Sequence, residues 1–415
     1  MHFLRHSQLR RDTLLLLAVQ GFYRLTGFVI LLVLSRRLTT TDIGAYFFAI
    51  AFAETAIVLA NFSLNPVMMR RVAAGPAQAS TYLHPLLGFR LLSSPVYLLC
   101  VFIATITFTS ASWQVMMAAA LFTLLEDISF SFGVFFLALR KAIYNVIIGA
   151  SVQIVYLTAF LVGMSRAPSL EVALGANLLR SLCFLGASAW VAHRRLCPLR
   201  VSWDSRLVKA GAPFLLTTFL IALREQTGTL LLGVLTDYDS VSRYGLAYRV
   251  VSTAIFIPTA VYAALSPLLV AQGLSGQNRR TLTRAIGLLA GLGLLAMGVV
   301  FLCAGPLTAV LYGSLADTVA PLLRPLTLLF PLSFLSLFLS STLQALYQEA
   351  RVVRAFIVVT VTNVLANCAL IPYFGAYGAA YAQILSTLLL LGILSGYLWK
   401  LFKQPVASVS PLPGP

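Results

Sequence analysis

The sequence has few charged residues, and acids are especially scarce. Charged side chains make up 10% of the 415 residues, with 29 Lys and Arg against 12 Asp and Glu, whereas soluble domains carry about 25%. Mean hydropathy is +0.92. The formal charge of +17 would suit a nucleic-acid-binding protein, but the cations lie between apolar runs of about 20 residues, the length that crosses a bilayer. The composition excludes a soluble domain and indicates a membrane protein.

Residues that build metal centres, disulfides and nucleotide sites are sparse or unsuitably spaced. The five cysteines form no CxxC pair, and the four histidines lie in or beside basic connectors without clustering. The chain has no GxxxxGK[ST] run, which argues against an ATP-driven pump. No small-residue cleavage pattern follows the first apolar run. We therefore expect no cofactor, no bound metal, no enzymatic activity, and a first apolar run that stays in the membrane.

Twelve apolar stretches are long enough to cross a bilayer. They lie at residues 13–35, 43–62, 85–108, 113–137, 145–164, 171–192, 210–234, 244–268, 285–303, 320–343, 353–372 and 376–398. The fold expected is therefore an all-α integral membrane protein. We place one six-helix bundle in residues 1–200 and a second in 201–398, and we expect the Pro- and Ser-rich tail 399–415 to be disordered. The longest outer connector predicted is 304–319.

The distribution of cations predicts the orientation. If the chain starts inside, inner segments hold 19 Lys and Arg and outer connectors hold four. The positive-inside rule then places both termini in the cytoplasm, and we expect a bacterial inner membrane.

Short internal matches suggest that the two halves are related. The paired segments are 38–42 with 235–239, 55–57 with 253–255, and 65–66 with 266–267. Because they occur in the same order at a nearly constant offset, we infer a parallel duplication of six spans.

Ten charged residues remain inside the predicted spans: Arg24, Arg90, Arg180, Arg224, Arg249, Arg324, Glu54, Glu126, Asp127 and Glu225. Each costs about 2.5–3.5 kcal/mol at a span centre, so these side chains must face protein or water. Arg24, Arg180 and Arg224 lie deepest. For Arg90, Arg249 and Arg324, near span ends, snorkelling to the interface competes with a place in a cavity.

These charges allow two interpretations. They could form buried ion pairs that only fix helix packing, such as Glu54 with Arg24, or they could line a polar site. Neighbouring residues on a helix diverge by about 100°, so Arg224 and Glu225 must find partners on other helices. The spans carry six arginines and four acids, and this excess favours an anionic, phosphorylated substrate, because a guanidinium donates two hydrogen bonds to phosphate.

Two motifs resemble a known family. Residues 363–386, NVLANCALIPYFGAYGAAYAQILS, and residues 244–250, YGLAYRV, are similar to segments of the multidrug/oligosaccharidyl-lipid/polysaccharide flippase superfamily, in its bacterial polysaccharide-flippase branch. In the second motif the order of Gly and Tyr is changed. Pro372, Gly375 and Gly378 also have a structural interpretation, a tight turn between the last two spans.

The resemblance implies two six-helix bundles around a central cavity that opens alternately to each face. It implies transport of an isoprenoid-diphosphate-linked oligosaccharide or polysaccharide precursor to the outer leaflet. It also places the substrate phosphates on basic residues of the first and eighth spans, here Arg24 and Arg249, with Arg180 and Arg224 as further candidates. Glu54, Glu126, Asp127 and Glu225 are candidates for coupling to a proton or sodium gradient; the sequence does not choose between the ions. Association with membrane lipids and polysaccharide-assembly proteins is a further expectation.

Two alternatives stay open. A drug/cation antiporter of the same superfamily should have a cavity biased toward acids. A membrane polysaccharide polymerase usually needs catalytic acids on a sizeable outer loop, whereas the predicted connector 304–319 carries one acid, Asp317.

Overall fold

The computed structural model describes residues 2–75, 79–108, 112–272 and 276–403, which form helices and short connections with no strand in these ranges. Twelve segments are long and apolar enough to cross a membrane, which confirms the predicted number. Helices satisfy their own backbone hydrogen bonds, as a segment in hydrocarbon must. The protein is therefore a multi-pass, all-α membrane protein.

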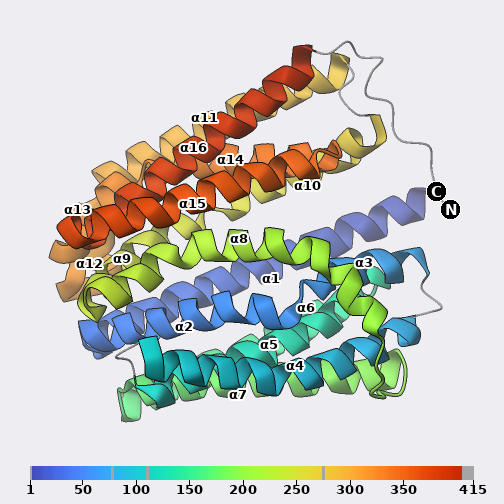
Figure 1. The fold of residues 1–415 in the computed structure, drawn as a ribbon, viewed down its shortest axis with the longest axis horizontal. Coiled ribbons are helices and arrows are strands. Elements are labelled where there is room, and N and C mark those ends of the chain that lie inside the picture. The colour runs from blue at the N-terminus through green and yellow to red at the C-terminus, as the bar shows by residue number, and fades with distance from the viewer. Residues whose placement is uncertain (1, 76–78, 109–111, 273–275, 404–415) are drawn as a thin grey trace. The chain divides into compact units, whose positions relative to one another are not determined.

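The chain divides into two compact units, unit 1 up to Ala222 and unit 2 from Leu223 onward. Unit 1 contains α1 (His2–Arg37), α2 (Thr40–Asn61), α3 (Leu64–Ala74), α4 (Ala79–Phe108), α5 (Trp113–Ala138), α6 (Ala142–Arg166), α7 (Leu170–Arg195) and the first part of α8 (Ser205–Leu235) (Figure 1). The division falls inside α8, beyond residue 200, the end predicted for the first bundle.

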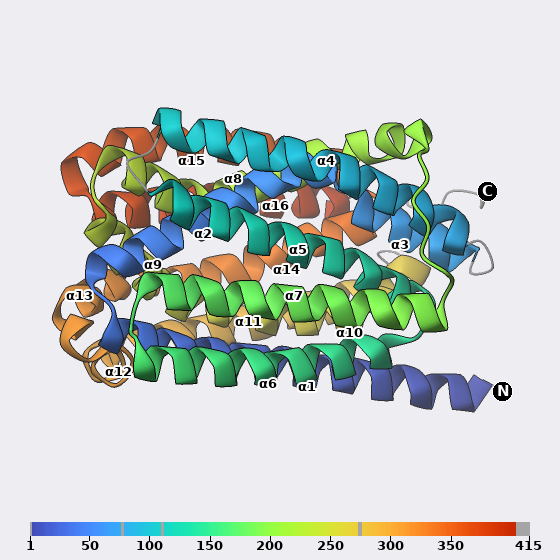
Figure 2. The ribbon, with the colours of Figure 1, turned by 90° about the horizontal axis from the view of Figure 1, so that it is seen from below.

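Helix α5 is the centre of unit 1. It packs against α2, α3, α4, α6 and α7, and 61% of its most apolar stretch is buried. Around it, α6 and α7 run side by side (Figure 2). This position matters because α5 carries two adjacent acids, Glu126 and Asp127, which must each find a partner inside the bundle.

A break separates α2 from α3. Phe62 and Ser63 both adopt left-handed backbone conformations, with φ of 51° and 50°. The side-chain oxygen of Asn61 accepts a hydrogen bond from the Ser63 amide at 2.9 Å. This local bond offsets part of the cost of placing two non-glycine residues in that region, and it places Asn61 and Asn65 beside the helices that follow.

The connector between α7 and α8, residues 196–204, lies against α4. The Ser202 amide donates to the His84 carbonyl at 3.3 Å, and the Trp203 ring stacks on Phe89 with centroids 6.2 Å apart. The Gly88 backbone directly contacts the Ser202 carbonyl, leaving no space for a Cβ. The connector is therefore held on unit 1.

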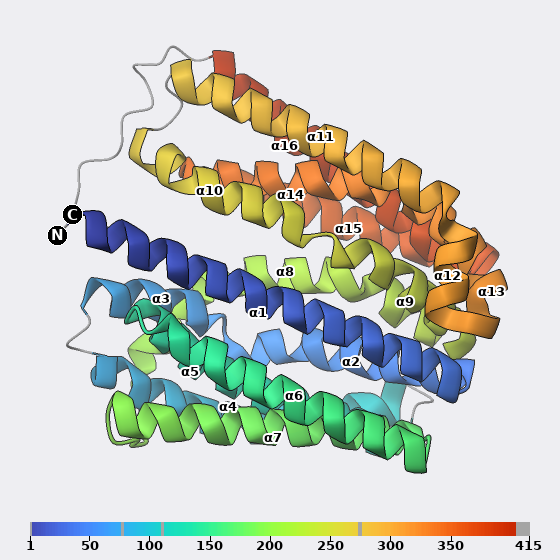
Figure 3. The same cartoon turned by 180° about the vertical axis from the view of Figure 1, so that it is seen from behind.

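Unit 2 contains the rest of α8 and α9 (Tyr238–Thr253), α10 (Phe256–Gln272), α11 (Gly276–Leu302), α12 (Ala304–Tyr312), the 3₁₀ turn η2 (Gly313–Leu315), α13 (Ala316–Leu326), α14 (Leu329–Ala345), α15 (Glu349–Phe374) and α16 (Ala376–Lys403). Helix α14 packs against α10, α11, α15 and α16, and Figure 3 shows unit 2 from behind.

Unit 2 corrects the tenth predicted span. The predicted connector 304–319 is wrong, because the apolar sequence AGPLTAVLY forms α12 and α13 begins at Ala316. The predicted span 320–343 instead covers parts of α13 and α14, which are separated at Thr327 and Leu328. Helix α16 extends to Lys403, five residues past the predicted end at 398, and tail residues 404–415 lie outside the described residues.

The predicted turn between the last two spans is confirmed. Helix α15 ends at Phe374, Gly375 follows with φ of 52°, and α16 starts at Ala376. Gly378 of α16 lies against the backbone carbonyl of Leu370 in α15. A side chain at either position would strain the backbone or collide with it.

Candidate functional site

The adjacent acids of α5 point to different helices. Consecutive residues on an α-helix are rotated by about 100° about its axis. Asp127 accordingly pairs with Arg90 of α4, whereas Glu126 pairs with Arg180 of α7. The two pairs differ greatly in exposure, and this difference separates a packing role from a ligand-binding role.

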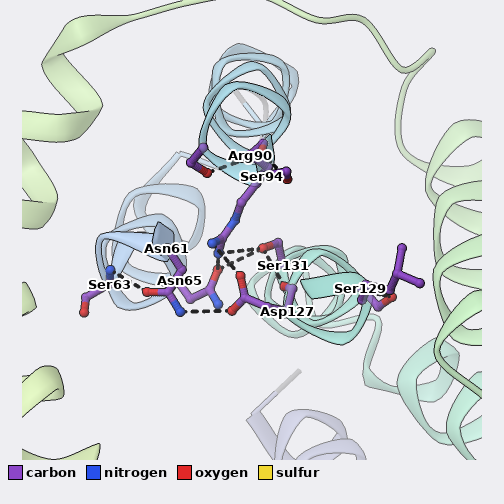
Figure 4. Close-up of polar contacts among 10 residues, drawn as sticks. Asn61, Ser63, Asn65, Arg90, Ser94, Asp127, Ser129 and Ser131 are labelled. Carbon is purple, nitrogen blue, oxygen red and sulfur yellow. Dashed lines mark hydrogen bonds and ion pairs between the residues drawn. The ribbon is translucent and has the colours of Figure 1, made fainter. Parts of the chain in front are cut away.

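The Arg90–Asp127 pair is sealed inside unit 1. The Arg90 Nη1 lies 2.5 Å from the Asp127 Oδ2, and the two side chains are 3% and 12% exposed. The Arg90 Nη2 donates to Ser131 Oγ at 3.1 Å and to Asn65 Oδ1 at 3.3 Å. The Asn61 side chain donates to the other Asp127 oxygen at 3.0 Å. Figure 4 shows these side chains converging from three sides.

This network joins the end of α2 with α3, α4 and α5. Both charges are neutralised, and Asn61, Asn65 and Ser131 add hydrogen bonds to the pair, while the buried Arg90 Nε has no hydrogen-bond partner within the described residues. Arg90 neither snorkels nor faces an open cavity; it forms a buried ion pair, the packing role that the sequence also allowed for these charges. The sequence did not identify Asp127 as the partner, because that depends on the depth and rotation of the next helix.

The Arg180–Glu126 pair is open by comparison. The Arg180 Nη2 contacts the Glu126 Oε1, and the side chains are 28% and 32% exposed. The same carboxylate oxygen accepts from Ser181 Oγ at 3.1 Å. The guanidinium carbon lies 5.0 Å from the centroid of the Tyr156 ring, a cation–π contact. The Nε of Arg180 has no hydrogen-bond partner within the described ranges.

Polar side chains surround this open pair. The Asn177 side chain donates to the Tyr46 hydroxyl at 3.0 Å, and Tyr46 in turn is hydrogen-bonded to Tyr156. Tyr23 of α1 interacts electrostatically with both members of the pair. We define the open cluster as Tyr23, Tyr46, Glu126, Tyr156, Asn177, Arg180 and Ser181. It draws on α1, α2, α5, α6 and α7. Its partly exposed cation suits an anionic ligand, whereas Tyr46, Tyr156, Asn177 and Ser181 are buried around it.

Two other candidates of unit 1 lie on α1 and α2. Arg24 is partly buried and Glu54 is exposed. Glu54 interacts electrostatically with Tyr97 of α4.

In unit 2, Arg224 is buried and Glu225 is exposed. Arg224 is 8% exposed, and its guanidinium carbon lies 5.9 Å from the centroid of the Phe356 ring. As predicted, these neighbours on α8 face different surroundings. The rings of Tyr244 and Tyr248 stack nearby on α9, with centroids 5.6 Å apart, and both interact electrostatically with Arg224.

A buried amide network joins α15 to α16. The Asn363 side chain donates to Gln383 at 3.2 Å and to Ser386 at 2.8 Å, and Asn367 donates to the Asn363 side chain at 3.2 Å. All four residues are at most 5% exposed. The sequence analysis assigned no role to these amides, although the spacing of Asn363 and Asn367, four residues apart in an apolar helix, was a signal for a polar stripe.

The remaining candidate arginines of unit 2, Arg249 and Arg324, are exposed. Arg249 lies on α9, one turn before the break that separates α9 from α10, and its carbonyl accepts from Ser252 and Thr253. Arg324 is on α13.

Comparisons with known proteins agree with the fold. Residues 9–272 match the family described as polysaccharide biosynthesis protein. The probable flippase AglR of Haloferax volcanii is 29% identical over 165 residues, a segment covering 38% of this chain and 34% of AglR, so the match spans about a third of that relative's length.

Solved structures with a similar fold include transporters and a flippase. The lipid II flippase MurJ, in an inward closed conformation, gives a TM-score of 0.69 at 14% identity, with 95% of this chain and 89% of MurJ covered. An inward-facing multidrug resistance MATE family transporter of the MOP superfamily gives 0.67 at 13%, with 93% and 94% covered. A MOP superfamily transporter from Pyrococcus furiosus gives 0.65 at 13%, with 97% and 95% covered. Because the family match covers well over half of the sequence, the chain belongs to the polysaccharide biosynthesis protein family, and its fold is that of the MOP superfamily.

Proposed function

We propose that this protein is a flippase that moves an isoprenoid-diphosphate-linked oligosaccharide or polysaccharide precursor from the cytoplasmic to the outer leaflet of the bacterial inner membrane. Units 1 and 2 would rock to expose the substrate site alternately to each face. The isoprenoid tail stays in lipid, and no covalent bond changes. Both termini lie in the cytoplasm in this proposal.

The observation that carries the proposal is the open cluster of unit 1. A guanidinium that is about one quarter exposed within an apolar bundle, and whose Nε has no hydrogen-bond partner within the described ranges, is a candidate ligand group. Arginine keeps its charge and can bind phosphate with two parallel hydrogen bonds. Family membership and similarity to proteins described as flippases give further support.

Roles follow for the candidate residues. Arg24 and Arg249 bind the diphosphate, with Arg180 and Arg224 as additional cationic ligands. Glu54, Glu126 and Glu225 are candidates for coupling to a proton or sodium gradient. Asp127, in contrast, neutralises Arg90 in the sealed pair, and we assign it a packing role.

The test is translocation by purified protein in liposomes. A fluorescent isoprenyl-diphosphate sugar is incorporated, and its flipping is followed by chemical quenching in the outer leaflet. We expect R24A and R249A each to lower the initial rate at least tenfold, since each removes a charge-assisted contact of about 1.5–3 kcal/mol. R243A is the matched control, because Arg243 is an exposed arginine on the same helix as Arg249.

Wild-type rates in both R24A and R249A would overturn the assignment of the two ligands. Absence of flipping by the wild-type protein, with gradient-driven uptake of a cationic dye instead, would overturn the flippase proposal in favour of a drug/cation antiporter.

A further inference from the structure

The connector of unit 1, residues 196–204, meets α4 where the exposed face of that helix becomes apolar. Exposed apolar side chains then recur at helical spacing along one stripe of α4: Leu92, Val96, Leu99, Ile103 and Ile106. An exposed apolar stripe on a spanning helix faces lipid. Phe89 continues the stripe three residues before Leu92, but the Trp203 ring of the connector stacks on it, and it is 8% exposed. The connector therefore lies at one edge of the hydrocarbon region.

Two apolar side chains of this connector point away from the protein. Trp203 is 54% exposed even though its ring stacks on Phe89, and Val201 is 65% exposed. Tryptophan is enriched where hydrocarbon meets lipid headgroups, because its ring is apolar while its N–H stays hydrated. Side chains of this kind at the end of a lipid-facing stripe indicate that the connector enters the membrane interface.

Exposed cations flank Trp203 on both sides. Arg200 precedes it by three residues, Arg206 follows it by three, and Lys209 lies one helical turn further along α8. The one acid in residues 196–204 is Asp204, whose carboxylate accepts a hydrogen bond from the Arg206 amide at 2.9 Å. Positive charge beside an interfacial tryptophan is complementary to the phosphate of an anionic headgroup.

We propose that residues 200–209, the lipid-docking segment, bind the headgroup of an anionic phospholipid such as phosphatidylglycerol. Trp203 and Val201 enter the interface, while the two arginines and Lys209 bind the phosphate. A guanidinium donates two hydrogen bonds to phosphate oxygens, and a lysine adds a point charge. This inference does not depend on what the protein transports.

The connector is fixed on α4 by contacts that need no lipid. The His84 imidazole lies 3.0 Å from the Pro198 carbonyl, and the Ser202 amide donates to the His84 carbonyl at 3.3 Å. At Gly88 the Ser202 carbonyl leaves no space for a Cβ. Figure 2 shows the connector running past α4 between α7 and α8. A segment that is held in place before binding loses little conformational entropy when a ligand binds.

The experiment uses full-length protein in which Trp203 is the single tryptophan. The other three, Trp113, Trp190 and Trp399, are exposed and are replaced by Phe. The protein in detergent is titrated with dioctanoyl-phosphatidylglycerol or dioctanoyl-phosphatidylcholine, and binding is followed by Trp203 emission. A Lys or Arg beside an anionic headgroup contributes about fivefold in affinity, so the three cations predict a preference of about a hundredfold for phosphatidylglycerol. This preference should fall as salt is added.

Variants separate the charges from the ring. R200Q with R206Q and K209Q should bind both lipids with similar affinity, because only the contribution of charge depends on the headgroup. W203S, followed by calorimetry, should weaken binding of both lipids by the same factor, because the apolar contribution does not depend on headgroup charge. R200K with R206K keeps the charges and should keep the preference.

The matched control removes three exposed cations of unit 2, Arg280, Arg284 and Lys400. R280Q with R284Q and K400Q makes the same change in total charge, so it should leave the preference at Trp203 unchanged. In nanodiscs that contain brominated lipids, the emission of Trp203 should be quenched most by bromine atoms placed near the headgroup.

Three results would overturn the inference. They are equal affinities of the protein for the two lipids, a preference that survives in the variant lacking Arg200, Arg206 and Lys209, and Trp203 emission that brominated lipids do not quench. If that variant does not fold, the salt dependence and the R200K/R206K variant decide the question, because a contribution of charge must weaken with salt and survive the exchange of Arg for Lys.

A competition experiment separates a phospholipid from an isoprenyl diphosphate, which also carries phosphate on an apolar tail. Farnesyl diphosphate is added to the protein with phosphatidylglycerol bound. Phosphatidylglycerol that stays bound at equal concentrations supports the lipid-docking segment. Complete displacement would assign the cations to the diphosphate instead and overturn the inference.

Discussion

The contrast between the sealed and the open pair predicts very different costs for two neighbouring substitutions. D127N removes the charge that neutralises Arg90, a residue that is 2% exposed. Removing one partner of a buried pair leaves an uncompensated charge and costs about 3–5 kcal/mol of unfolding free energy. The amide introduced by D127N would keep the bond to Asn61 but would not restore the balance of charge, because the guanidinium stays ionised.

E126Q should cost far less. The Arg180–Glu126 pair is about one third exposed, so the arginine that is left behind is far less enclosed than Arg90, and exposed pairs contribute about 1 kcal/mol or less. The two substitutions are adjacent in one helix and make the same chemical change, a carboxylate to an amide. Their difference, about 2–4 kcal/mol, therefore isolates the effect of enclosure.

The assay is unfolding by SDS in mixed micelles, followed by tryptophan fluorescence and referred to the wild-type protein. A double variant, R90M with D127L, tests the explanation: it removes both charges, so it should recover most of the stability that D127N loses. Equal losses in E126Q and D127N, or a double variant that is less stable than D127N, would refute the reasoning that enclosure of the charge sets the cost.

Two predictions concern the connector of unit 1. Burial raises the pKa of the Cys197 thiol, so less of the reactive thiolate is present at a given pH. In a variant that lacks the other four cysteines, maleimide should therefore label Cys197 slowly at neutral pH. The labelling rate should still be increasing above about pH 8.5, where a free cysteine is half ionised, and a rate that levels off at or below this pH would contradict the prediction. G88A adds a Cβ against the Ser202 carbonyl, which should displace the connector and speed Cys197 labelling several-fold. G186A is the control, because the space around Gly186 is open, and it should label at the wild-type rate. Equal rates in both variants would show that the connector does not depend on the contact between Gly88 and Ser202.

The sequence predicts the number of spans well, because the hydrocarbon thickness requires about 20 apolar residues per helix and apolar composition is local information. It fails for 304–319, where a short apolar run forms α12 without spanning alone. The break between α9 and α10 at Ala254 and Ile255 was also missed. A short helix and a helix break both leave backbone N–H and C=O groups without partners in their own helix. Whether neighbouring helices can satisfy these groups depends on tertiary packing, which the local sequence does not show.

Pairing between spans was the least predictable feature. The sequence shows that Arg90, Arg180 and the acids of α5 need partners, because unpaired charges are costly in a membrane. It does not show which acid meets which arginine, since that depends on helix rotation and depth. Glu126 and Asp127 were therefore treated as equivalent coupling candidates, although in the structure one pair is open and the other is sealed.

Consecutive charges in one span nevertheless carry information that does not need the structure. Rotation by about 100° prevents two neighbours from sharing one environment, so a charged pair of neighbours marks a helix with two polar contacts on different faces. Glu126 and Asp127 on α5 show this in unit 1, and buried Arg224 beside exposed Glu225 shows it on α8. In each case one neighbour is enclosed while the other is accessible. The enclosed charge can then fix the rotation of the helix, and the accessible one is held in position to meet a ligand.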